Sequence, residues 1–463
     1  MIETRLLDLD DVPFRSPASP SVFGLALVVF GTLALPPQPA RAVDEKARIA
    51  RVIDVAPVWS GHPVGFDLVT RGERQYVAFY DAQRRMTIAS RTVAADCWQL
   101  QRLPSTLGWD SHNAVVLAVD DEGRLHVVGN MHASHLVYFR SKKPWDITTL
   151  EPIHRMVGRE EHRCTYPNFF RGPSGEFLFT YRDGESGNGN QIYNVYDLKA
   201  RSWRRLLDGP LTDGEGARNA YLEGPTRGPD GIYHLIWVWR ETPDCATNHD
   251  LSYARSRDLV HWETSSGQPL TLPIRLKSGE VVDPVPEHGG LINGCEHLGW
   301  DSRRRPVITY HKFAANGKTQ AYAARLEGSR WVIRQLTDWN YRWDFHGGGS
   351  IPSEIHLGAV GPAGSGRLQL DFRHATQGSG RLVLDEESLR RLEIAPPDAP
   401  PWRRELSRPG SSFPGMQVHL LPQTVAGRLH VLRWETLGPN RDQPRGGRLP
   451  GPSRLQLFEV ERD

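Results

Sequence analysis

The chain has 463 residues, of which 56 are Lys or Arg and 54 are Asp or Glu, so its formal net charge is only +2. Such an even balance lacks the basic surface of nucleic-acid binders and argues against that class of function. The 14 Trp, 44 Gly and 35 Pro favour many short strands joined by turns, and no long apolar stripe with a helical period is present.

The N-terminal segment has the pattern of an export signal. Residues 22–35 are an apolar run that is short for a membrane span, and the small residues Ala40 and Ala42 after it resemble a peptidase site. We expect residues 1–42 to be a signal peptide and the mature protein to reach the periplasm or the extracellular space. A buried core strand or a membrane anchor is the alternative for this run.

Seven short apolar strands, each preceded by a tight turn, recur along the rest of the chain. Successive turns lie roughly 50 to 70 residues apart, which is the size of one four-stranded propeller blade. The turns bear Gly72, Gly123, Gly175, Gly231, Arg305, Gly366 and Gly427. This repeat predicts an all-β fold in which residues 43–463 form a single seven-bladed β-propeller domain with four-stranded antiparallel blades.

In chain order, residues 43–62 come first, and the strand expected within them completes the last blade and closes the ring, because closure removes exposed sheet edges. A Pro-rich stretch at residues 398–413 connects the last two blades, and residues 438–452 form a long loop in the last one. The predicted blades span residues 63–105, 110–155, 164–208, 218–268, 290–338, 349–398 and 414–461.

The propeller topology predicts where the polar residues gather. First strands begin, and second strands end, on the same face, so the clusters at these positions meet there. An ordinary surface is rich in Lys and Glu, whereas this one is rich in residues suited to proton transfer on an acidic sugar and to its recognition. The residues expected on this face include His112, Asn113, His132, Tyr166, Asn168, Arg182, Tyr221, Arg240, His311 and Arg373.

Four of these residues form a recognisable pattern. His112 lies in a Ser-His-Asn motif, and His132 follows 20 residues later. Tyr166 lies in Thr-Tyr-Pro-Asn, and Arg182 follows in Tyr-Arg-Asp-Gly. The pattern resembles the propeller-type ulvan lyases, which belong to the wider group of BNR-4 repeat secreted proteins. The resemblance implies that the protein cleaves an anionic polysaccharide by β-elimination at a uronic acid and that these four residues are catalytic.

The chemistry of β-elimination suits those residue types. The C5 proton of a uronate is weakly acidic, and Arg182 would stabilise the enolate-like intermediate because a guanidinium grips a carboxylate through two bonds. Tyr166 is a candidate acid for the departing O4 and a candidate base. The two histidines are the other candidates for the base or for neutralising the carboxylate. The expected substrate-binding residues are Asn113, Asn168, Tyr221 and Arg240.

A second cluster, made of Cys and His residues, lies in blades four and five. Zn²⁺ accepts mixed Cys and His ligands, and the resemblance to the lyases implies a structural zinc. The spacing of the cluster matches no compact motif, and a Cys245–Cys295 disulfide is the alternative in an exported protein. No organic cofactor is expected. The predicted zinc ligands are Cys245, His249, Cys295 and His311.

The leading prediction is therefore an exported, monomeric polysaccharide lyase acting on an ulvan-like polymer. One alternative is a sialidase-like glycoside hydrolase, whose arginine triad would be imitated by Arg182, Arg240 and Arg373. A propeller that binds a glycan without cutting it is another. Elimination leaves an unsaturated uronate, which neither alternative produces.

Overall fold

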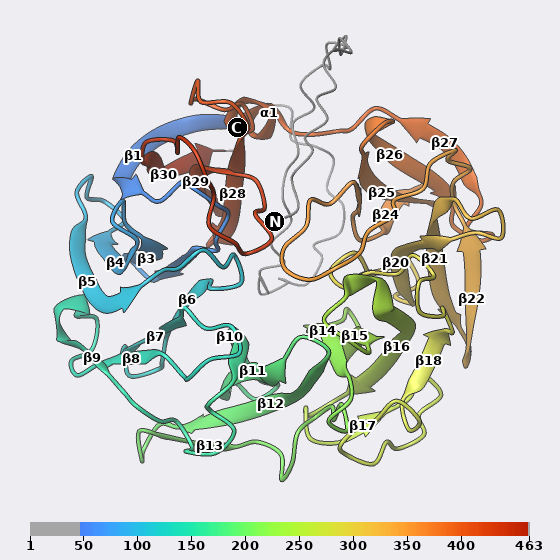
Figure 1. Cartoon of the computed structure of the whole chain (residues 1–463), viewed down its shortest axis with the longest axis horizontal. Helices are drawn as coiled ribbons and strands as arrows, with labels where there is room; N and C mark the ends of the chain where they lie inside the picture. The colour runs from blue at the N-terminus through green and yellow to red at the C-terminus, as the bar shows by residue number, and fades with distance from the viewer. Residues whose placement is uncertain (1–46, 462–463) are drawn as a thin grey trace, which may run out of the picture.

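Runs rich in Val, Ile, Tyr and Trp form the strands, and turns bearing Gly, Asp or Arg connect them. The computed structural model describes residues 47–461, which form seven antiparallel sheets arranged in a ring (Figure 1). The predicted all-β, seven-bladed propeller is confirmed. The signal peptide predicted at residues 1–42 lies outside the described residues. Within the described part of the chain, no helix is long and apolar enough to cross a bilayer.

We number the sheets as blades one to seven in chain order. Blade one contains β2 (Asp67–Arg71), β3 (Arg74–Tyr80), β4 (Arg85–Thr92) and β5 (Gln99–Thr106). Blade two contains β6 (Val115–Val119), β7 (Leu125–Gly129), β8 (Tyr138–Ser141) and β9 (Leu150–Pro152). Blade three contains β10 (Cys164–Arg171), β11 (Phe177–Glu185), β12 (Asn188–Asp197) and β13 (Ser202–Arg205).

The remaining blades differ slightly from the predicted four strands, because blades four and six each have a fifth strand in the described chain. Blade four contains β14 (Asn219–Arg227), β15 (Tyr233–Arg240), β16 (Asn248–Ser256), β17 (Trp262–Glu263) and β18 (Glu280–Asp283). Blade five contains β19 (His297–Trp300), β20 (Pro306–Phe313), β21 (Thr319–Glu327) and β22 (Arg330–Gln335). Blade six contains β23 (Ile355–Leu357), β24 (Gly361–Gly364), β25 (Arg367–His374), β26 (Gly378–Asp385) and β27 (Arg391–Ala395).

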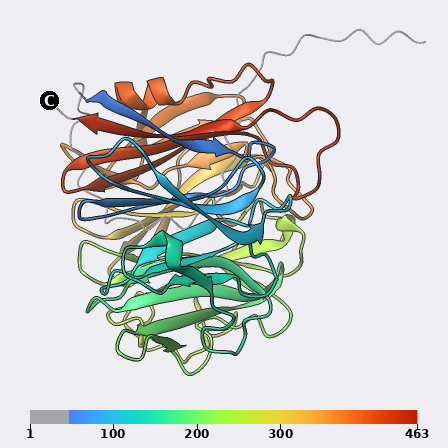
Figure 2. The same ribbon diagram turned by 90° about the vertical axis from the view of Figure 1, so that its left-hand side faces the viewer.

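The ring closes through the N-terminal strand, as the sequence predicted. Blade seven contains β28 (Met416–Val425), β29 (Arg428–Leu437), β30 (Ser453–Glu461) and β1 (Arg48–Val58). The blue strand β1 pairs antiparallel with the red strand β30, beside which it lies in the side view (Figure 2). The Pro-rich connection before this blade contains a short helix, α1 (Pro401–Leu406), where the sequence pattern predicted only a connecting segment.

The core lies between neighbouring blades and is built from strands that are apolar on both faces. In β15, Trp237 and Trp239 are completely buried. One cluster of buried side chains joins Trp434 of blade seven to Tyr76 of blade one and Val115 of blade two. Such packing fixes each blade against the next, so residues at the edges of different blades keep a constant geometry. We call the side on which innermost strands begin and second strands end the upper face.

Candidate active site

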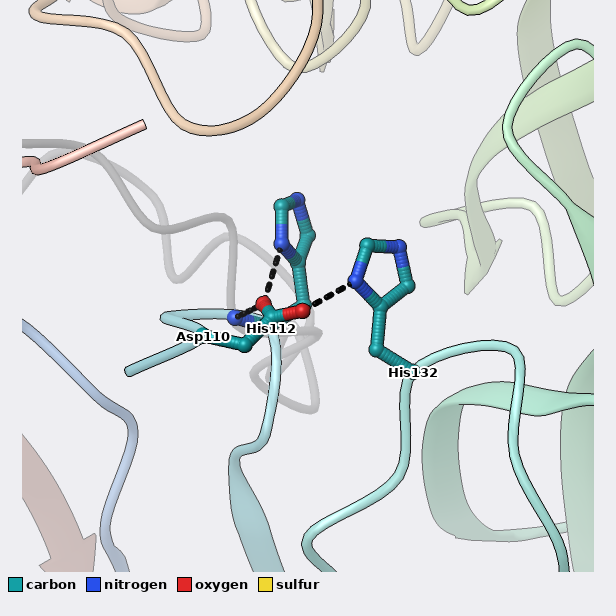
Figure 3. Close-up of side chains that lie close together, drawn as sticks. All are labelled: Asp110, His112 and His132. Atoms are coloured by element: carbon teal, nitrogen blue, oxygen red, sulfur yellow. Dashed lines mark hydrogen bonds and ion pairs between the residues drawn. The ribbon is translucent and has the colours of Figure 1, made fainter. Parts of the chain in front are cut away.

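Asp110 joins two histidines of blade two through its two carboxylate oxygens (Figure 3). Asp110 and His112 lie in the loop before β6, and His132 lies just after β7. Nδ1 of His112 lies 2.8 Å from Oδ1 of Asp110, and Nδ1 of His132 lies 2.5 Å from Oδ2. The two imidazole rings stack with centroids 4.2 Å apart. The upper face thus brings His112 and His132 together.

The two imidazoles differ in charge because their surroundings differ. Burial opposes the charge on His112, but Tyr166 and two carboxylates raise the pKa of His112 well above its ordinary value. Burial lowers the pKa of His132, and its hydrogen bond to Asp110 offsets this effect only in part. At neutral pH His112 is therefore an imidazolium, whereas His132 is neutral with its proton on Nδ1 and a lone pair on Nε2.

The second carboxylate beside His112 belongs to Asp442, in the long loop between β29 and β30. Oδ2 of Asp442 lies 3.2 Å from Nδ1 of His112, and Oδ1 accepts from the backbone N–H and the hydroxyl of Ser111. Burial would raise the pKa of Asp442, but the contact with His112 lowers it to about 2. Sequence reasoning missed this residue, because no pattern fixes where a long loop folds.

Tyr166 reaches the site because its strand is irregular. The pairing of β10 with β11 shifts register between Thr165 and Asn168, which is a β-bulge at Tyr166 and Pro167. Tyr166 has a φ of 56°, in the left-handed region that a tyrosine rarely adopts. Bulges re-aim side chains, and strained backbone gathers at functional sites. The Tyr166 ring lies 5.9 Å from the His112 ring, centroid to centroid.

Arg182, at the end of β11, lies beneath the phenol rings and is only 1% exposed. Its guanidinium carbon is 5.0 Å from the ring centroid of Tyr166. Its Nη1 donates to the Tyr221 hydroxyl at 3.4 Å, and its Nη2 donates to Oγ1 of Thr165 at 3.0 Å. The arrangement differs from the expected two-bond grip on a substrate carboxylate, because the guanidinium supports the phenols from below.

Tyr221, at the start of β14, extends the site into blade four. Its hydroxyl lies 2.9 Å from Oγ of Ser186, and its ring centroid lies 5.3 Å from the guanidinium carbon of Arg240. Burial opposes ionisation, but the positive charges of Arg182 and Arg240 bring the pKa of Tyr221 below its ordinary value. Two phenols, Tyr166 and Tyr221, therefore lie side by side with ring centroids 6.2 Å apart.

The other residues expected to bind substrate differ in their exposure and in their hydrogen-bond partners. Asn168 lies in β10 near Tyr166 and is partly exposed. Asn113 follows His112, but its side-chain oxygen is buried without a hydrogen-bond partner. The Arg240 guanidinium donates to the backbone carbonyls of Thr242 and Pro243, so it faces the loop rather than an open groove.

The structure does not assemble the predicted zinc ligands. Among residues 47–461, the one group of three His, Cys, Asp or Glu ligand atoms within 4.8 Å of one another is Asp110, His112 and His132. His249 uses both ring nitrogens on the carboxylates of Asp250 and Glu241. Zinc at this cluster is therefore not supported by the geometry, and metal analysis is its test.

The other three predicted ligands are buried in one region of blades four and five. Cys245 and Cys295 are free thiols within one hydrophobic cluster, so the alternative disulfide is not formed either. Nδ1 of His311 donates to the Gly290 carbonyl at 2.9 Å, while its Nε2 is buried without a partner. Two buried thiols and a buried imidazole in neighbouring blades explain why the sequence suggested a metal, but their ligand atoms do not converge.

The site therefore offers an imidazolium, a neutral imidazole with a free lone pair, and two phenols supported by a buried guanidinium. These groups come from blades two, three and four and meet on the upper face. Together they can neutralise an acidic group, remove a proton from a neighbouring carbon and return a proton to an oxygen. These are the functions required by proton transfer on an acidic sugar.

Comparison with known proteins identifies relatives of the chain. An ulvan lyase of family PL25 from Pseudoalteromonas sp. (strain PLSV) is 21% identical over 316 residues, which are 58% of this chain and 63% of that protein. The match thus spans less than two thirds of the length of that relative. The crystal structure of the polysaccharide lyase Uly1 has a TM-score of 0.60 at 14% identity and covers 90% of this chain and 100% of its own.

A solved structure of a PL25 ulvan lyase has a TM-score of 0.55 at 13% identity and covers 84% of this chain and 97% of its own. At such low identities these structures establish a shared fold. The BNR repeat-containing family matches residues 74–339, more than half of the chain. The chain therefore belongs to the BNR repeat-containing family.

Proposed function

We propose that this protein is a polysaccharide lyase that cleaves a uronic-acid-containing anionic polysaccharide by β-elimination. The observation that carries the proposal is the Asp110 carboxylate, which holds a charged His112 and a neutral His132 on one face beside Tyr166. The relative and the solved lyase named above are ulvan lyases, and one structure of the latter is bound to -[GlcA(1-4)Rha3S]-. A sulfated glucuronate polymer of this kind is the substrate that we propose first.

In the proposed reaction, the imidazolium of His112 pairs with the uronate carboxylate and makes the C5 proton more acidic. Nε2 of His132 takes that proton, because its lone pair is free while Nδ1 is bound to Asp110. The C4–O4 bond breaks as the C4–C5 double bond forms, and Tyr166 protonates O4. The buried guanidinium of Arg182 stabilises the phenolate that remains until His132 returns a proton to it.

The hydrolase alternative is less favoured. A sialidase-like triad needs three guanidinium groups directed at one carboxylate. Arg182 is instead covered by the two phenols, and Arg240 is bound to backbone carbonyls. A non-catalytic propeller would have no use for two histidines held at different charges by one carboxylate.

Incubation of the purified protein with ulvan tests the proposal, with the ultraviolet absorbance of the unsaturated uronate as the readout. We expect the absorbance to rise with the wild type and not with Tyr166→Phe. New reducing ends without that absorbance would contradict elimination. Because the substrate is a polymer, we also propose that the protein acts outside the cytoplasm, in agreement with the signal predicted at residues 1–42.

A further inference from the structure

A second group of residues on the upper face, next to the proposed active site, has the features of an anion-binding site. Arg84 lies in the turn between β3 and β4 of blade one. Its guanidinium carbon lies 3.9 Å from the ring centroid of Trp59 and 4.4 Å from that of Trp109. The two indoles are 5.4 Å apart at an interplanar angle of 80°. All three residues are partly exposed.

The guanidinium of Arg84 has no hydrogen bond or ion pair with any residue that the structure describes; its hydrogen bonds are those of its backbone. Its neighbour Arg85 is different, because it pairs with Asp81 at 3.3 Å. A guanidinium has five N–H donors. Partial burial of these donors without an acceptor costs free energy, unless a ligand supplies the acceptor. The indoles hold the group in place through cation–π contacts and leave its N–H edges for a ligand.

The surrounding loops fix this group rigidly. Nε1 of Trp59 donates to Nδ1 of His62 at 2.9 Å, and the His62 ring lies 5.6 Å from the Trp109 ring. Gly61 permits this packing, because a Cβ there would lie 2.2 Å from the Trp59 ring. A cation held in this way loses little conformational entropy when it binds an anion.

The same group is joined to the proposed active site. Trp109 precedes Asp110 in the chain, so their Cα atoms are about 3.8 Å apart. The carbonyl of Trp109 accepts from Nδ2 of Asn440, in the loop that also carries Asp442. A polymer bound across His112 and His132 therefore has a fixed, unpaired cation at its side.

We propose that Arg84, supported by Trp59 and Trp109, forms a subsite that binds an acidic group on a neighbouring sugar of the polysaccharide. This inference rests on the proposed lyase function, whose substrate carries an acidic group on each repeat. The ligand chemistry is an oxyanion gripped by two parallel N–H bonds. It is a carboxylate or a sulfate ester, and the two sources are separated by experiment.

The test compares Arg84→Gly and Arg84→Lys with Arg85→Ala as a matched control in the same turn. Arg84 has a φ of 66°, where glycine is unstrained, so Arg84→Gly removes the guanidinium while relieving the backbone. On ulvan we expect Arg84→Gly to raise KM about tenfold, since a charge-assisted hydrogen bond contributes on that scale. Arg84→Lys should fall between Arg84→Gly and wild type, because lysine keeps the charge but loses the planar fork. Arg85→Ala should match wild type.

Desulfated ulvan identifies the group that is bound. If the KM difference between wild type and Arg84→Gly disappears on that polymer, the ligand is a sulfate ester; if it persists, the ligand is a carboxylate. Equal KM values for Arg84→Gly and Arg85→Ala on ulvan would overturn the subsite. Should the wild type yield no unsaturated product, affinity electrophoresis on ulvan still decides the question. If ulvan retards Arg84→Gly less than it retards wild type and Arg85→Ala, the subsite stands although the lyase proposal fails. If ulvan retards all three proteins equally, the subsite and the lyase proposal are both wrong.

Discussion

Asp442 lies on the loop of the last blade, yet its carboxylate is 3.2 Å from Nδ1 of His112 in the second blade. The loop that carries it projects from one side of the ring (Figure 2). The contact ties the end of the chain to the proposed active site and helps to keep His112 charged.

Asp442→Asn should therefore change the pH dependence of the reaction. The substitution keeps an oxygen for the Ser111 N–H but removes a negative charge, so the pKa of His112 falls. Because the proposed reaction needs His112 charged, the alkaline limb of kcat/KM against pH should move to lower pH. The control is Asp338→Asn, an exposed acid of blade five that pairs with Arg391. An alkaline limb unchanged in Asp442→Asn would show that this carboxylate does not set the charge.

His132 should determine the acid limb of the same profile. Its pKa is lowered, chiefly by burial, so we expect the limb to lie below the ordinary histidine pKa of about 6.5. His132→Ala should reduce kcat by roughly 10²–10⁴-fold, the usual contribution of a general base. Thermal unfolding of the variant checks that the propeller is intact. An acid limb that His132→Ala leaves in place would assign the base to another group.

Arg182 should matter for folding as well as for activity. Arg182→Ala removes the charged donors that the guanidinium supplies to the buried Thr165 hydroxyl and the Tyr221 phenol, at a cost of about 1–3 kcal/mol in the free energy of unfolding. Urea denaturation measures this loss. Tyr166→Phe is the comparison, because it should abolish cleavage with little change in stability. If Arg182→Ala were inactive but as stable as wild type, the buried position described above would be wrong.

Closure of the ring by β1 can be tested on one strand. Ile53 is 3% exposed and belongs to the core cluster shared by blades seven, one and two, whereas its neighbour Val52 is 50% exposed. Ile53→Ala should lower the free energy of unfolding by about 2–5 kcal/mol, while Val52→Ala should change it by less than about 0.5 kcal/mol. Equal effects of the two substitutions would mean that β1 does not complete blade seven.

The fold could be predicted from the sequence because a repeated strand and turn constrain every blade alike. The same repeat predicted that His112, His132 and Tyr166 meet on one face, since strand ends have fixed positions in a propeller. It could not show that Arg182 is covered, because part of the cover comes from Tyr221 in the next blade. Asp442 was missed because loops have no periodicity.

The zinc prediction stays a prediction, and the geometry of its residues does not support it. Cys245, Cys295 and His311 do lie in neighbouring blades, as the topology rule implied, and all are buried. Ligand geometry, however, depends on side-chain directions that strand positions do not determine. His249 illustrates this, since two carboxylates occupy its nitrogens.

The central claim is that the groups around Asp110 eliminate rather than hydrolyse. Mass spectrometry of the fragments released from ulvan tests this most directly, because each new non-reducing end is an unsaturated uronate after elimination and is heavier by one water after hydrolysis. We predict unsaturated ends throughout with wild type and no fragments with Tyr166→Phe. Saturated ends, or fragments from Tyr166→Phe at the wild-type rate, would contradict the mechanism.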